Sequence, residues 1–211
     1  MNIYFFGDSI SFGQGISIDL TWVNKIAQQL HRQCVGEQNM VINVSVNGNT
    51  TRMALERMPY DIQSHEVDVL VVGFGMNDCN YWITDKGVPR VSPKAFKANL
   101  EEIVERGFHF GAKEVLLRTN HPSPRKDYMI NTKITYGESN HQYNDIIREV
   151  AKNDPRIKFV DMEQEFDRYI MEHNIRLEEL TLSDGVHLSL LGHDAYFESM
   201  YPMIANIVSG E

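Results

Sequence analysis

Ile3-Tyr4-Phe5-Phe6-Gly7-Asp8-Ser9-Ile10 is the stretch around which the rest of the chain is organised. Its four leading apolar residues predict a buried strand. Gly7 permits a sharp turn where that strand ends, and ligands of α/β proteins bind at this edge of the sheet. Gly-Asp-Ser also suits an ordinary turn or a helix N-cap, so the tripeptide alone does not establish a site. We interpret Ser9 as a candidate nucleophile and expect Asp8 to brace the turn.

Apolar strands and amphipathic helices alternate along the rest of the chain. Further strands are predicted at 40–46, 67–72, 113–119 and 157–162, and helices at 22–30, 51–58, 93–108, 143–150, 166–170 and 191–207. Strands separated by helices at intervals of roughly 30 to 40 residues indicate right-handed βαβ units. The fold class expected is α/β, a three-layer α/β/α sandwich with a five-stranded parallel sheet. At 211 residues, the chain is expected to form a single domain, 1–211.

Composition excludes several classes of function. The formal net charge of -9 leaves no basic surplus to replace the counterions of a nucleic acid, so that partner is not expected. No stretch approaches the roughly 20 consecutive apolar residues of a transmembrane helix. A strand that begins near residue 3 leaves no room for a secretory signal, which predicts a cytoplasmic location. Cys34 and Cys79 lack Cys-x-x-Cys spacing and are expected to be free thiols, and no metal-binding spacing is present.

Three loops are predicted to leave the carboxyl ends of the first three strands and to meet at one edge of the sheet. They carry Ser9, Gly48 and Asn77. A glycine amide, an asparagine side-chain amide and the amide of Ser9 would together hold the oxyanion of an acyl-transfer reaction. Taken singly, Gly48 and Asn77 are equally compatible with ordinary turns.

A serine nucleophile needs a base, and Asp184-x-x-His187 supplies one together with a group to orient it. Asp184 would accept a hydrogen bond from one imidazole nitrogen while the other nitrogen faces Ser9. The spacing alone is common, and a lone histidine is usually structural or exposed.

These motifs occur in the order Gly-Asp-Ser, Gly48, Gly75-x-Asn77-Asp78 and Asp184-x-x-His187, and in this order they resemble the SGNH hydrolase superfamily, or GDSL esterase/lipase family. The resemblance implies a flavodoxin-like fold and a serine hydrolase that needs no cofactor. It further implies Ser9, Asp184 and His187 as the catalytic triad, and Ser9, Gly48 and Asn77 as the oxyanion hole. Ile10 departs from the leucine of many members, a change of similar volume.

The expected function is hydrolysis of a carboxylic ester through an acyl-enzyme on Ser9. A short acyl group such as acetate on a carbohydrate is the first choice of substrate. Asn80, Trp82 and His121 are candidates to line the substrate site, although core packing explains aromatic residues equally well. A lysophospholipase or thioesterase acting on longer chains is the alternative enzyme, and a catalytically silent carbohydrate- or partner-binding module is the alternative of another class. The sequence does not indicate the oligomeric state.

Overall fold

The computed structural model describes residues 1–33 and 39–210, and Cys34 lies outside them. Within the described residues, one parallel sheet has the strand order β2-β1-β3-β4-β5. Its strands are β1 (Asn2–Gly7), β2 (Met40–Asn43), β3 (Val69–Gly73), β4 (Glu114–Arg118) and β5 (Ile157–Val160). All four pairings are parallel, so the carboxyl ends of the strands meet at one edge.

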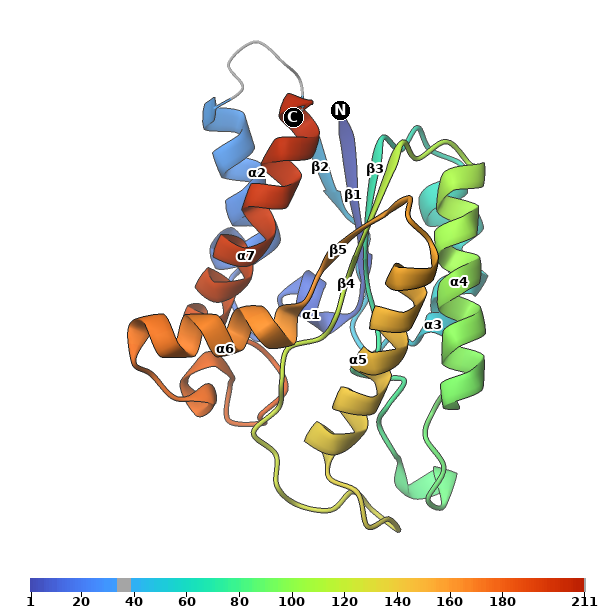
Figure 1. The fold of residues 1–211 in the computed structure, drawn as a ribbon, viewed down its shortest axis with the longest axis vertical. Coiled ribbons are helices and arrows are strands. Elements are labelled where there is room, and N and C mark those ends of the chain that lie inside the picture. The colour runs from blue at the N-terminus through green and yellow to red at the C-terminus, as the bar shows by residue number, and fades with distance from the viewer. Residues whose placement is uncertain (34–38, 211) are drawn as a thin grey trace.

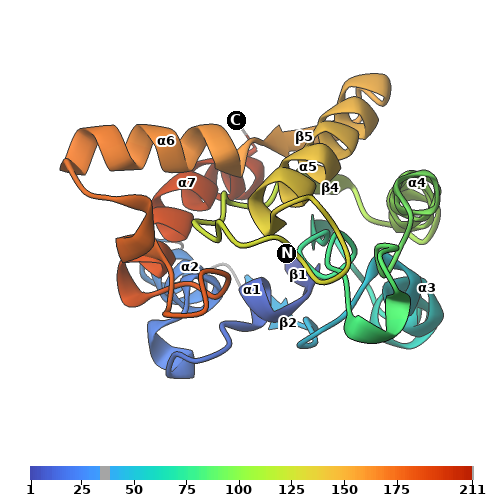
Figure 2. The same cartoon turned by 90° about the horizontal axis from the view of Figure 1, so that it is seen from below.

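Helices cover both faces of the sheet (Figures 1 and 2). One face carries α2 (Trp22–Gln33), α6 (Met162–His173) and α7 (Leu190–Ser209), and the other carries α3 (Thr51–Met58), α4 (Pro93–His109) and α5 (Tyr136–Asn153). The short α1 (Ser9–Phe12) follows β1 directly. The predicted three-layer sandwich with a five-stranded parallel sheet is therefore confirmed.

The central strand β3 explains why the sheet is covered on both sides. Its sequence, Val-Leu-Val-Val-Gly, is buried at every position. An aliphatic run without polar alternation has no face to offer to water, so both of its faces must pack against helices. The register pairs Gly7 of β1 with Gly73 of β3, which brings the loops that follow these two strands side by side.

Several element boundaries differ from the sequence-based expectation, and three of them have a local explanation. Helix α5 begins at Tyr136, well before the apolar pattern at 143–150, because Thr135 and Glu138 form a capping box ahead of it. Pro59 ends the α-helical part of α3 as predicted, but the chain continues into a π-helical turn, Pro59–Gln63. Strand β2 ends at Asn43, short of the predicted residue 46, and Asn43 Oδ1 accepts a hydrogen bond from the N–H of Ser45, two residues further on, at 3.1 Å.

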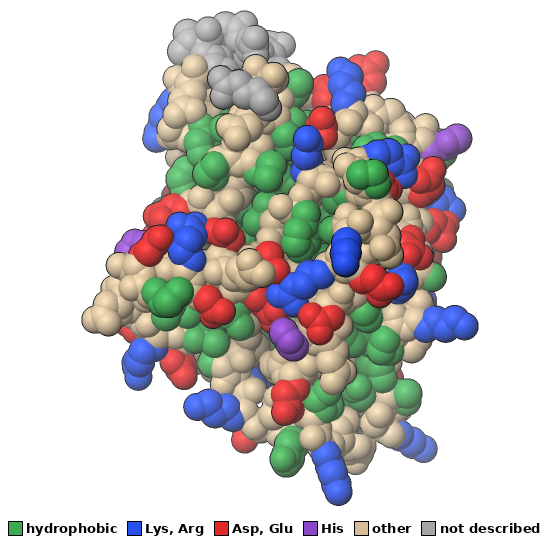
Figure 3. Space-filling model, in the orientation of Figure 1, with side chains coloured by type: hydrophobic (Ala, Val, Ile, Leu, Met, Phe, Trp, Pro, Cys, Tyr) green, Lys and Arg blue, Asp and Glu red, His purple; other side chains and the backbone are tan. Residues whose placement is uncertain are grey.

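The face of the molecule seen in the orientation of Figure 1 agrees with the charge balance of the sequence. On the face shown in Figure 3, acidic and basic side chains are interspersed, with no extended basic area. No described helix combines the length and apolar character needed to cross a bilayer.

Candidate active site

Ser9 is the first residue of α1, where β1 gives way to a single helical turn. Asp8 is the N-cap of that turn, and its Oδ1 accepts from the Ile10 N–H at 3.0 Å. Gly13 closes the turn in the left-handed region, at φ 84°, with its N–H bonded to the Ser9 carbonyl. Gly-Asp-Ser therefore does form a helix N-cap, and this is compatible with Ser9 as a candidate nucleophile, because the N-cap geometry fixes the backbone that presents Ser9.

The structure brings His187 to Ser9 across 178 positions of sequence. His187 Nε2 lies 3.0 Å from Ser9 Oγ, and His187 Nδ1 lies 2.6 Å from Asp184 Oδ2. Because an ionised carboxylate only accepts, Nδ1 carries the proton, and Nε2 is left to accept from the serine hydroxyl. The three side chains thus form a hydrogen-bonded relay, Asp184–His187–Ser9, that ends at Ser9 Oγ.

The loop that carries Asp184 and His187 is held by Asp184 itself. Its Oδ1 accepts from the N–H groups of Val186 and His187, both at 2.9 Å. Burial acts most strongly on the pKa of Asp184 and would raise it, but the hydrogen bonds from the His187 side chain and from these two amides outweigh burial. The pKa of Asp184 therefore lies below its usual value, and the carboxylate is ionised where an imidazolium would need a counter-charge.

Asn77 and Gly48 both accept hydrogen bonds from Arg90. Arg90 Nη1 donates to Asn77 Oδ1 and to the Gly48 carbonyl, and Nη2 donates to the same carbonyl, all at 3.2 Å. With its oxygen turned to Arg90, the Asn77 amide directs Nδ2 back toward the Ser9 turn, where it donates to Asp8 Oδ2 at 3.3 Å. Gly48 has φ 76°, and no hydrogen bond within the described residues uses its N–H.

No motif in the sequence marks Arg90. It follows Asn77 by 13 positions and stacks on the Trp82 ring, with Cζ 3.9 Å from the ring centroid. One guanidinium thus connects the loop after β2, the loop after β3 and an exposed aromatic side chain. Only the tertiary contacts identify it as part of the site.

Two buried ionisable side chains, Asp8 and Arg118, lie near the Ser9 turn. Burial raises the pKa of Asp8, and the nearby Arg118 guanidinium opposes that effect. Arg118 is itself fully buried and donates to Ser11 Oγ at 3.1 Å and to the Tyr196 hydroxyl at 3.3 Å. It fits there because residue 73 is glycine: a Cβ at that position would lie 2.4 Å from Arg118 Nη2.

A small pocket opens directly onto the serine. It measures about 210 Å³ and is lined by Ser9, Met76, Asn77, Asn80, Arg125, Tyr136, Asp184, Val186 and His187. Of the three candidate substrate contacts from the sequence, Asn80 lies in this lining. Trp82 does not, since it is half exposed and packed on Arg90. Arg125 and Tyr136 are additions; Arg125 lies in the long segment between β4 and α5, and Tyr136 is the first residue of α5.

His121 is not a substrate contact in this structure, which corrects the expectation from the sequence. Its side chain is fully buried, with Nδ1 2.9 Å from the Tyr196 hydroxyl and Nε2 2.9 Å from the Val186 carbonyl. Burial lowers the pKa of His121 to about 3. The ring is therefore neutral and supports the loop that carries His187.

Within 1–33 and 39–210, no three histidine, cysteine, aspartate or glutamate side chains gather closely enough to hold an ion. Cys79 is a buried free thiol whose pKa is raised by burial.

Sequence comparison relates the chain to known ester hydrolases. The model of the GDSL-like lipase/acylhydrolase family matches residues 5–195. An arylesterase of Vibrio mimicus is 25% identical over 182 residues, which cover 86% of this chain and 76% of the relative. Esterase TesA of Pseudomonas aeruginosa is 28% identical over 111 residues, or 53% of this chain and 50% of its own.

Solved structures share the fold over nearly the whole chain. The acetyl xylan esterase AlAXEase superposes with a TM-score of 0.79 at 23% identity and covers 97% of this chain and all of its own. Axe2, an acetylxylan esterase from Geobacillus stearothermophilus, has a TM-score of 0.76 at 20% identity, covering 94% of this chain and 91% of its own. At these identities the likeness is one of fold.

Proposed function

The chain belongs to the GDSL-like lipase/acylhydrolase family, and we propose that it removes short acyl groups, acetyl above all, from carbohydrate esters. The observation that carries the proposal is the relay in which His187 Nε2 is 3.0 Å from Ser9 Oγ and Nδ1 is 2.6 Å from Asp184. A serine hydroxyl with a base at hydrogen-bond distance, itself oriented by a carboxylate, is equipped for nucleophilic attack on a carbonyl.

The reaction follows from the placement of these groups. Ser9 Oγ forms a bond to the ester carbonyl carbon while His187 takes its proton. The negative charge that develops on the carbonyl oxygen is held by the amides of Ser9 and Gly48 and by Asn77 Nδ2. His187 then returns the proton to the alcohol oxygen as the ester bond breaks. Water, deprotonated by His187, releases the acid and restores Ser9.

The small volume beside Ser9 supports a short acyl group. At about 210 Å³, the pocket is below the usual range of roughly 300 to 1,000 Å³ for small-molecule sites. Its apolar contribution comes from Met76, Val186 and the buried Tyr136, enough surface for a methyl group and too little for a long chain. The names of the structural neighbours, acetyl xylan esterases, point the same way.

Two alternative functions predict different results in an activity assay. A lysophospholipase or thioesterase would prefer octanoyl or longer esters to acetyl esters. A catalytically silent binding module would retain the fold without turnover. The arylesterase name of one relative adds aryl acetates as practical test substrates.

The experiment combines covalent labelling with a chain-length series. The unmodified protein should be labelled by a fluorophosphonate and should hydrolyse p-nitrophenyl acetate faster than the octanoate. Ser9→Ala should abolish labelling and nearly all turnover, while Ser64→Ala, which alters an exposed hydroxyl outside the site, should change neither. Absence of labelling and turnover in the unmodified protein would refute the enzyme assignment, and a preference for octanoate would refute the short-chain assignment.

A further inference from the structure

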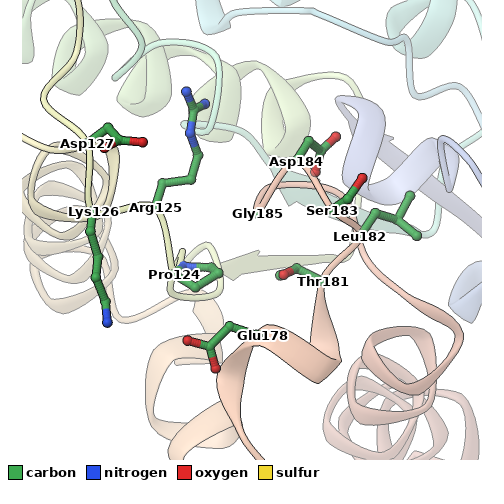
Figure 4. A pocket seen from close by; sticks show the side chains of 10 residues that line it. All are labelled: Pro124, Arg125, Lys126, Asp127, Glu178, Thr181, Leu182, Ser183, Asp184 and Gly185. Atoms are coloured by element: carbon green, nitrogen blue, oxygen red, sulfur yellow. The ribbon is translucent and has the colours of Figure 1, made fainter.

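A second and larger cleft adjoins the catalytic pocket. It measures about 500 Å³ and lies between the 124–127 segment and the 178–185 segment. In Figure 4, Arg125, Lys126 and Asp127 lie on one side and Thr181 to Asp184 on the other, with Glu178 at the lower end. Arg125 and Asp184 line both the cleft and the catalytic pocket, so the two spaces are adjacent at that end.

We propose that this cleft binds the alcohol portion of the ester, and that this portion is a neutral, hydroxyl-rich saccharide. The proposal rests on the esterase function proposed above. It adds where the leaving group lies, which side chains hold it and what chemistry they select.

The path of the proton places the alcohol on this side of Ser9. His187 must donate to the alcohol oxygen as the ester bond breaks, so that oxygen has to lie near His187 Nε2. The cleft wall is formed by the residues just before His187, in the same loop. The oxyanion, by contrast, faces Gly48 and Asn77, and neither of these lines the cleft.

The lining favours hydroxyl groups over an acyl chain. Seven of its ten side chains are polar, and only Pro124, Leu182 and Gly185 are not. A long acyl chain would bury methylene groups against charged side chains and would gain little from leaving water. A sugar presents hydroxyl groups that both donate and accept, and the cleft offers both kinds of partner.

The available charges also select against a strongly charged ligand. Lys126, Asp127 and Glu178 make no ion pair or side-chain hydrogen bond with any other described residue, so all three can bind a ligand. Because both signs are present, neither a polyanion nor a polycation would be well matched. Arg125 stacks over Tyr136, with Cζ 5.2 Å from the ring centroid, which holds a donor where the cleft meets the catalytic pocket.

The test compares two kinds of ester that share an acetyl group and differ in the alcohol. One is p-nitrophenyl acetate, and the other is a panel of acetylated xylo-, manno- and gluco-oligosaccharides. In the double variant Lys126→Met/Glu178→Leu, kcat/KM for the best oligosaccharide should fall about tenfold or more relative to kcat/KM for p-nitrophenyl acetate, because two charged hydrogen-bonding partners are lost. The control Lys94→Met/Glu56→Leu changes exposed charges of α4 and α3 and should leave that ratio as it is.

Three results would overturn the cleft proposal. One is an unchanged ratio in Lys126→Met/Glu178→Leu. Another is an equal fall in the ratio of the two kcat/KM values in the control variant. The third is a protein that hydrolyses p-nitrophenyl acetate but none of the acetylated oligosaccharides. Failure of the esterase function itself is distinguishable from all three, because the unmodified protein would then hydrolyse no p-nitrophenyl acetate at all.

Discussion

Replacing Arg90 with methionine should slow acyl transfer without weakening substrate binding. Arg90 touches neither Ser9 nor His187, and its hydrogen bonds at 3.2 Å go to Asn77 Oδ1 and to the Gly48 carbonyl. The guanidinium is the hydrogen-bond donor that the described structure provides for Asn77 Oδ1. Without it, the amide is held only by the hydrogen bond from Nδ2 to Asp8 Oδ2 at 3.3 Å, so the direction of Nδ2 toward the proposed oxyanion is less firmly fixed. Arg90 is thus a positioning residue that acts through its two neighbours.

The size of the effect follows from what Arg90 holds. Loss of one oxyanion donor costs about 100- to 1,000-fold in kcat, which sets an upper limit for a residue that only orients such a donor. A hydrogen bond to a charged group contributes about 1.5–3 kcal/mol, and the half-buried position of Arg90 puts its effect toward the lower end. We therefore expect kcat to fall about 10- to 100-fold, with KM little changed.

A double-mutant cycle separates this role from a general loss of structure. The variants Arg90→Met, Asn77→Ala and their combination are assayed on p-nitrophenyl acetate. If Arg90 acts mainly through Asn77, its replacement should cost much less in the Asn77→Ala background, by about tenfold or more. Arg90→Lys should recover part of kcat, because it restores a single donor and the charge. Arg52→Met, which alters an exposed arginine of α3, is the matched control for folding and activity.

Two outcomes would refute the reasoning about Arg90. Fully additive losses in the cycle would mean that Arg90 does not act through Asn77. A rise in KM at constant kcat would mean that Arg90 contributes to ground-state binding instead of orienting an oxyanion donor.

Three further perturbations test other parts of the site. Asp184→Asn should lower kcat on p-nitrophenyl acetate about a thousandfold, because the imidazole loses the acceptor that sets its tautomer, and near-normal kcat would exclude Asp184 from the relay. Burial raises the pKa of Asp78 to about 6, so the folded state binds a proton on Asp78 more tightly than the unfolded state does. The stability that this protonation contributes is complete below about pH 4 and is lost as the pH rises through 6. The free energy of unfolding of Asp78→Asn, measured by urea titration, should therefore rise by roughly 3 kcal/mol relative to that of the parent between about pH 4 and pH 8, at about 1.36 kcal/mol per unit of pKa. A difference between the two proteins that does not change with pH would contradict this. Gly73→Ala should destabilise the fold by about 1–3 kcal/mol, since its Cβ would lie 2.4 Å from the buried Arg118, and an unchanged urea midpoint would contradict that packing argument.

Local patterns in the sequence account for most of the fold. The aliphatic run of β3 and the apolar spacing of α4 depend on periods of two and 3.6 residues, which are visible in a short window. The parallel topology followed, because connections between parallel strands are long and right-handed. The apolar pattern at 143–150 predicts only part of α5, because the first turns of this helix depend on the capping box of Thr135 and Glu138 instead of on apolar spacing.

The sequence by itself determined which residue types the site contains and which elements they adjoin: a serine after β1, an asparagine after β3, and an aspartate and a histidine before α7. Sheet topology then brings these groups to one edge, and the tertiary structure decided which neighbours they meet there. It placed Arg90 on Asn77 and Gly48, buried His121 beneath the His187 loop, and opened the cleft beside Arg125. The physical reason is that these contacts join loops distant in sequence, and the direction of a loop side chain is set by packing against other loops, for which a linear pattern carries no period.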